Sequence, residues 1–169
     1  MTMSSALRKF ALTAHVTTSV GWLGAVAAFL ALAISGVASP DGGTMRAAYV
    51  AMNLTGWFVI VPLCLASFVS GVVLACGTPW GLLRHYWVVV KLIVSVVATI
   101  VLLAHMQPVS RMAEAAIEMP SSLATMRRMR LQIIGDAGAA LAALLLATTL
   151  SVYKPKGLTR FSRKGVAPL

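Results

Sequence analysis

The stretch WGLLRHYWVVVKLIVSVVATIVLLA, residues 80–104, decides the fold class of this chain. Residues 80–91 contain two basic residues, a histidine and two tryptophans, whereas residues 92–104 carry no charge. Aromatic and basic side chains at the edge of a long uncharged run are typical of a helix that enters a membrane. Lys91 lies at that edge, where it either extends back to the interface or has a function within the membrane.

The composition of the whole chain is that of a membrane protein. Of its 169 residues 59% are hydrophobic and 11% are charged, whereas about 25% are charged in a soluble domain. The formal net charge is +10, but the basic residues flank the apolar runs, so we expect no nucleic-acid partner. No long polar linker interrupts the chain, and we expect a single domain over residues 1–169.

Four long apolar runs predict four membrane-spanning helices. They cover about residues 10–35, 49–75, 86–106 and 131–153. A helix needs about 20 apolar residues to cross the hydrocarbon layer, and each run is long enough. The first run is also too long for the apolar core of a secretory signal. The predicted fold is therefore all-α, an integral membrane four-helix bundle with up-down-up-down order.

Prolines mark where the predicted helices bend or end. Pro62 falls inside the second span and should bend it, because the carbonyl of Phe58 loses its backbone donor. Pro108 is expected to close the third span. Residues 109–119 then form a separate, short amphipathic surface helix before the fourth span. Residues 154–169 form a basic tail.

Lysine and arginine counts predict the orientation. The side with more of these residues faces the cytoplasm. Eight lie in the N-terminus, the second loop and the tail, and five lie in the other two loops. We therefore expect a multi-pass protein of the bacterial inner membrane, surrounded by lipid, with both termini in the cytoplasm. A second copy of the chain and another membrane protein stay open as partners.

Four ionisable side chains fall inside the predicted spans. They are His15, Lys91, His105 and Asp136. A charged side chain at the centre of a span costs about 2.5–3.5 kcal/mol on insertion scales, so each such residue needs an explanation. His15 and Trp22 are seven residues apart and share one helix face. A hydrogen bond to a neighbouring helix would explain His15 equally well, and contact with the interface would explain Lys91.

Two of these side chains are expected to form a structural polar pair on the outer side. Asp136 enters the fourth span at about the depth where His105 leaves the third, so the carboxylate can neutralise and orient the imidazole. Lys91 and His105 lie about 21 Å apart along one helix, which is too far for one small ligand. The sequence therefore predicts two separate sites, one near each membrane surface.

Methionines near His105 leave copper binding open. The methionines on this predicted side are Met106, Met112, Met119, Met126 and Met129. Thioether and imidazole ligands suit Cu(I), and His105 with Met106 would be the first candidates. Methionine is also a common apolar filler, and these residues form no regular array.

The first and third spans resemble a known superfamily. Residues 15–24, HVTTSVGWLG, resemble the first-helix pattern His-x6-Trp-x-(x)-Gly of the copper-resistance-D-like superfamily, which includes the HemJ-type protoporphyrinogen oxidases. Residues 77–91, GTPWGLLRHYWVVVK, and 151–157, SVYKPKG, look like one uncharacterised bacterial family of this group, domain of unknown function 2269. The resemblance covers most of the chain and implies a four-helix membrane protein without an assigned activity.

The resemblance also implies a cofactor. HemJ-type oxidases have a first-helix histidine, matching His15, that is implicated in binding haem b. Their third helix begins with a Trp-x-x-Lys-like pattern, which Trp87 and Lys91 match with one extra residue between them. The leading hypothesis is a small, redox-related membrane protein that holds haem b on the cytoplasmic side, with His15 as the metal ligand. The candidate cofactor-binding residues are His15, Trp22, Arg84, His85, Trp87 and Lys91.

Two alternatives stay open beside haem binding. One is a copper-handling membrane protein that uses His105 and the outer methionines. The other is a non-catalytic membrane partner or assembly subunit without a cofactor. The sequence does not decide whether the protein is an enzyme.

Overall fold

Long helices run through all the apolar stretches of the chain. The computed structural model describes residues 3–77, 82, 85–118 and 126–153. The elements are α1 (Ser5–Ala38), α2 (Gly42–Thr55), the π-helix η1 (Gly56–Ile60), α3 (Val61–Gly77), α4 (Tyr86–Glu118) and α5 (Arg127–Tyr153). Because α2, η1 and α3 are continuous, they form one long rod. All four rods are long and apolar enough to cross a membrane, which confirms the predicted all-α, multi-pass membrane fold.

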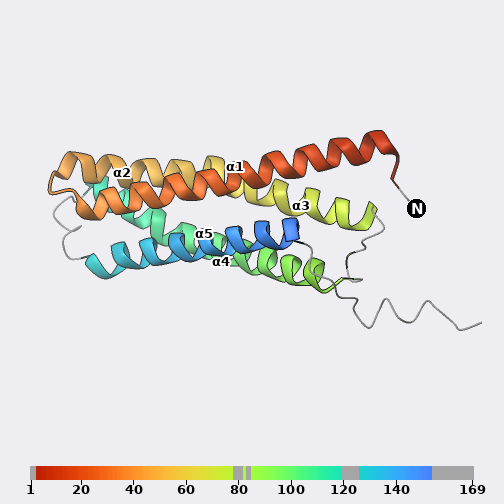
Figure 1. The fold of residues 1–169 in the computed structure, drawn as a ribbon. Helices are drawn as coiled ribbons and strands as arrows, with labels where there is room; N and C mark the ends of the chain where they lie inside the picture. Colours follow the sequence, from red (N-terminus) through yellow and green to blue (C-terminus); the bar gives the residue numbers. More distant parts are fainter. Residues whose placement is uncertain (1–2, 78–81, 83–84, 119–125, 154–169) are drawn as a thin grey trace, which may run out of the picture.

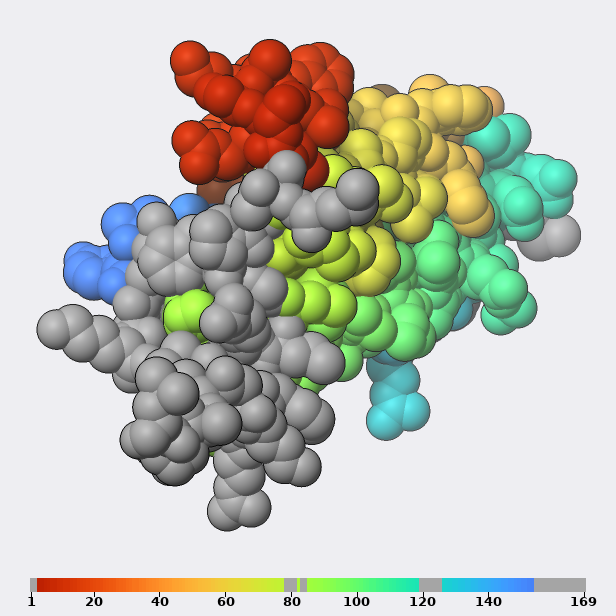
Figure 2. All heavy atoms as spheres, turned by 90° about the vertical axis from the view of Figure 1, so that its right-hand side faces the viewer, coloured from red at the N-terminus to blue at the C-terminus, as the bar shows by residue number. Residues whose placement is uncertain are grey.

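The four rods lie side by side and alternate in direction (Figure 1). Helix α1 packs along α2, α3 and α5, and α4 packs against α2, α3 and α5. The start of α1 and the end of α5 consequently lie at the same end of the bundle, which we term the terminal end. The opposite end, which holds the turn between α1 and α2, is termed the distal end. Figure 2 looks onto the terminal end, where the first turns of α1 and the last turn of α5 occupy separate corners.

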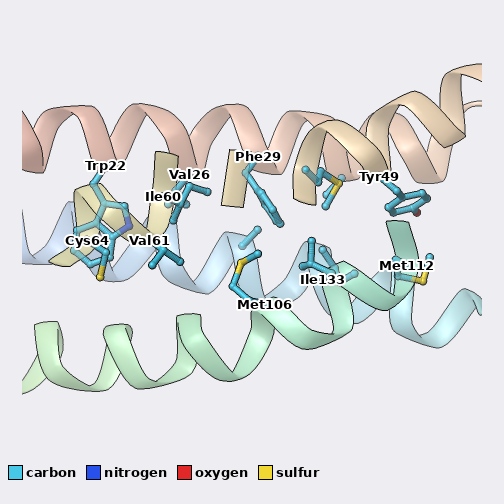
Figure 3. Close-up of a cluster of buried hydrophobic side chains, with 14 of the residues drawn as sticks. Trp22, Val26, Phe29, Tyr49, Ile60, Val61, Cys64, Met106, Met112 and Ile133 are labelled. Atoms are coloured by element: carbon cyan, nitrogen blue, oxygen red, sulfur yellow. The ribbon is translucent and has the colours of Figure 1, made fainter. Parts of the chain in front are cut away.

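An apolar core fills the distal half of the bundle and reaches its middle (Figure 3). Its largest fully buried side chains are Tyr49, Met52, Cys64, Met106 and Met112. The outer surface is apolar as well, and Phe58, for example, is 74% exposed. An apolar outside is expected where lipid replaces water as the solvent, since lipid tails solvate such side chains. Core and surface are therefore both consistent with a position in the bilayer.

The prediction that Pro108 closes the third span is wrong, and so is the separate surface helix over residues 109–119. Helix α4 continues through Pro108 to Glu118, and Met119 lies outside the described residues. The side chains of this segment that pack inside the bundle are Val109, Met112, Ala113 and Ala116. Proline in a helix interior costs about 3 kcal/mol. Close packing of this apolar face, including the two alanines, against the neighbouring helices offsets the cost of the proline.

The irregularity expected at Pro62 takes the form of a π-helix. In η1 the backbone N–H of Val61 donates to the carbonyl of Gly56, five residues earlier. Proline has no backbone N–H to donate to the carbonyl one turn earlier. The wider π-turn changes the hydrogen-bond partners of the carbonyls in that turn. Gly56 also allows a close approach of α4, because a Cβ atom there would lie 2.5 Å from Cε of Met106.

Asp41 caps the start of α2, and its effect should depend on pH. Its Oδ2 accepts from the backbone N–H of Thr44 at 2.7 Å and from the Thr44 hydroxyl at 2.8 Å. These hydrogen bonds, the backbone one first, lower the pKa of Asp41 below its ordinary value. A lowered carboxyl pKa means that the stabilisation is present above the ordinary pKa and is lost as the pH falls through the lowered one.

We therefore expect the amide of Thr44 to lose its protection from hydrogen exchange on acidification. Asp41→Ala should lack this protection already at neutral pH, because the N-cap acceptor is gone. Asp41→Asn is the matched control, since its amide oxygen accepts at any pH and should keep Thr44 protected in acid. Equal protection in wild type and Asp41→Ala would contradict the assigned cap.

Candidate functional site

A cavity of about 740 Å³ opens near the terminal end, between α1, α3, α4 and α5. This volume lies within the range of sites that hold small organic ligands. Most of the lining is apolar, with leucine, valine and alanine side chains from all four helices. The basic and imidazole side chains that line it are Arg8, Lys9, His15 and Lys91. No described lining residue is acidic, so the cavity favours a ligand with negative charge.

His15 extends from α1 to the cavity wall and is anchored there by α3. Its Nδ1 lies 3.0 Å from the carbonyl oxygen of Ser67 and 3.1 Å from Oγ of Ser70. The Ser70 hydroxyl already donates to the Ala66 carbonyl at 2.6 Å, so both partners of Nδ1 act as acceptors. Nδ1 therefore carries the hydrogen, and Nε2 keeps its lone pair.

Gly71 makes room for this imidazole. A Cβ atom at this position would lie 3.0 Å from Cε1 of His15, which is closer than side chains ordinarily approach. The neighbouring contact between Ser19 and Ser67, 2.7 Å between their hydroxyl oxygens, joins the same two helices. Small and hydroxyl side chains thus bring α1 and α3 close together around His15.

Lys91 links three helices at the cavity. Its Nζ donates to Oγ of Ser151 on α5 at 2.7 Å, and lies 3.4 Å from Nε2 of His15 on α1. Because Nε2 holds a lone pair, the lysine is the donor in this contact. Within the described part of the chain, no acidic side chain forms an ion pair with Lys91. The described contacts of Lys91 therefore supply hydrogen-bond acceptors but no negative charge.

Trp22 lies deeper along α1, on the same face as His15. Its indole is 6% exposed and packs beside Cys64 and Val61 (Figure 3). The indole Nε1 is buried and has no hydrogen-bond acceptor among the described residues. Trp22 is also one of the residues that line the cavity.

The structure thus brings four of the six sequence-predicted cofactor residues to one cavity, namely His15, Trp22, Trp87 and Lys91. His85 is not among the described lining residues, although its ring lies 6.4 Å from that of Trp87, centroid to centroid. Arg84 lies outside the described residues.

Sequence reasoning missed the residues that hold this site together. Ser67 and Ser70 anchor His15, Ser151 accepts from Lys91, and Arg8 and Lys9 line the cavity. The spacing of Ser67 and Gly71 signals close helix packing, but nothing in it points to an imidazole on another helix. Arg8 and Lys9 read as topology signals alone.

The distal side of the molecule holds the pair that the sequence predicts. Nε2 of His105 and Oδ2 of Asp136 form an ion-pair contact between α4 and α5. Met106, the other candidate copper ligand, is 1% exposed and packs in the apolar core near Gly56. The described residues include no group of three or more His, Cys, Asp or Glu side chains arranged around one point.

Comparisons of the chain with protein-family models, with curated proteins and with solved structures gave no match. The resemblance to the copper-resistance-D-like superfamily therefore stays a prediction. What the fold and the cavity define is a class: a small multi-pass α-helical membrane protein with an internal, positively charged cavity near one end.

Proposed function

We propose that this membrane protein binds haem b in the cavity near its terminal end, with His15 as the iron ligand. The observation that carries the proposal is the hydrogen bonding of His15. A metal-binding histidine usually donates its second ring N–H to a carbonyl or carboxylate, which sets the tautomer and the ring orientation. The Ser67 carbonyl accepts from Nδ1 in this way, and Nε2 keeps a lone pair towards the cavity side that Lys91 lines.

The charges and the lining of the cavity support the same ligand. Haem combines a flat apolar ring with two propionate groups. The apolar lining suits the ring, while Arg8, Lys9 and Lys91 offer positive charge to the propionates. Iron at Nε2 would replace the hydrogen bond from Lys91, and the lysine would be released for a carboxylate. Bound haem supplies one-electron redox chemistry, and the residues of the chain bind and orient it.

Absorption spectroscopy of the full-length protein tests the proposal. After expression with ample haem and purification in detergent, we expect a Soret band and about one haem per chain by chemical extraction. Colourless protein that contains copper by elemental analysis would favour the copper alternative and overturn haem binding. Protein with neither haem nor copper would overturn both and leave the cofactor-free partner role.

We propose further that the terminal end faces the cytoplasm of a bacterial cell. The excess of basic residues at the termini and in the second loop supports this orientation. A reporter that is active only in the periplasm should be silent when fused after Leu169. The same reporter inserted between α4 and α5 should be active. The reverse pattern would contradict this orientation and place the cavity on the outer side.

A further inference from the structure

His105 and Asp136 lie deep within the membrane-spanning helices and far from the cavity. Measured along the helices, His105 is about 20 Å and Asp136 about 13 Å from the nearer end of its own helix. Their side chains are only 25% and 34% exposed, and the two atoms that meet, Nε2 and Oδ2, are buried. Neither atom has another partner in the described part of the chain. The pair therefore has to satisfy its own charge and hydrogen bonds.

The second ring nitrogen determines how many protons the pair holds. Nδ1 of His105 lies 3.2 Å from the carbonyl oxygen of Val101, one turn earlier in α4. A carbonyl only accepts, so Nδ1 carries a hydrogen. Nε2 faces a carboxylate oxygen, and a stable contact there needs a hydrogen between the two atoms. Either Nε2 donates it to Asp136 as part of an imidazolium, or a protonated Asp136 donates it to Nε2.

Both arrangements contain the same number of protons. Imidazolium with carboxylate and imidazole with carboxylic acid each have zero net charge and differ only in where one hydrogen lies. A neutral imidazole with a hydrogen on Nδ1 beside a charged carboxylate would instead place a lone pair against a negative oxygen. It would also leave one net charge among apolar side chains, where charge is poorly solvated.

We propose that His105 and Asp136 form a proton-binding site inside the bundle, which holds one exchangeable proton between Nε2 and Oδ2. This inference is independent of haem binding, because it concerns other residues, which lie towards the distal end of the bundle. Loss of the proton would leave the lone pair of His105 Nε2 facing the negative Oδ2 of Asp136 between α4 and α5. Occupancy of the site is therefore coupled to the packing of these two helices.

Among the described residues, no other charged side chain pairs with His105 or Asp136. No described ionisable side chain of α1, α2 or α3 forms an ion pair or hydrogen bond with either residue. On the same helices the nearest charged residues along the chain are Arg111, six positions after His105, and Arg130, six positions before Asp136. Arg130 is engaged by Tyr49 and by carbonyls of α1.

Nuclear magnetic resonance and infrared spectroscopy of the full chain in lipid nanodiscs test the proposal. With ¹⁵N-labelled histidine, the signals of His105 are those that vanish in His105→Gln. The infrared band of a protonated Asp136 is the one that vanishes in Asp136→Asn. At neutral pH we expect either two ring N–H groups on His105 or a carboxylic acid band from Asp136.

The matched control is Glu114→Gln, which removes an exposed carboxyl group from α4 and should leave both signatures unchanged. The protonation states are read from the wild-type protein, and the two variants serve only to assign its signals. One ring N–H on His105 together with an ionised Asp136 at neutral pH would overturn the proposal.

Discussion

His15→Ala is expected to abolish haem retention and to leave membrane insertion intact. The substitution removes the only imidazole among the described residues that line the cavity, and the methyl side chain of alanine cannot bind iron. Insertion should be unaffected, because the first span becomes more apolar. The measurement is the Soret absorbance per chain in detergent, compared with wild type, and we expect it to fall to background.

Two further variants show whether the effect is specific to the iron bond. Lys91→Ala should weaken haem retention without abolishing it, because it removes a charge partner of the propionates and not the ligand. His105→Gln is the matched histidine control, since His105 contacts Asp136 far from the cavity, and its Soret band should equal that of wild type. An unchanged Soret band in His15→Ala would assign the iron to another residue. His15 would then be a hydrogen-bonding link between α1 and α3.

Arg130→Ala is expected to cause the largest loss of stability. Arg130 is 9% exposed, although the sequence suggests an ordinary loop charge. Its Nη2 donates to the carbonyls of Gly36 at 2.7 Å and Val37 at 3.3 Å, and its Nε donates to the Tyr49 hydroxyl at 2.9 Å. The last carbonyls of a helix lack helical donors, so Arg130 satisfies the end of α1. Leaving these groups buried without a donor should cost about 3 kcal/mol.

Unfolding in mixed detergent measures this loss against graded controls. Tyr49→Phe removes only the hydroxyl and should cost about 1 kcal/mol. Arg130→Lys keeps the charge but not the planar fork of donors, so its effect should lie between the two. Arg127→Ala removes an exposed arginine from the same turn of α5 and should be close to neutral. If Arg130→Ala lowered the free energy of unfolding no more than Arg127→Ala, the buried contacts of Arg130 would contribute no net stability.

The sequence alone determines the fold class and the number of spans. Apolar runs of about 20 residues form helices in lipid, because every backbone group has to be satisfied within its own segment. Helical periodicity also places His15 and Trp22 on one face, and both line the cavity. The depths of His105 and Asp136 predict their pairing, since alternating rods bring equal depths together.

Only the tertiary structure decides which side chains complete each site. The contacts of Ser67, Ser151 and Arg130 do not follow from the sequence, because they depend on donors and acceptors that other helices supply. The same holds for Pro108, where a local rule predicts a helix end and the packing of the following residues carries α4 further. Local periodicity determines a helix and its faces, whereas contacts between helices depend on the rotation and depth of each rod, which no single segment encodes.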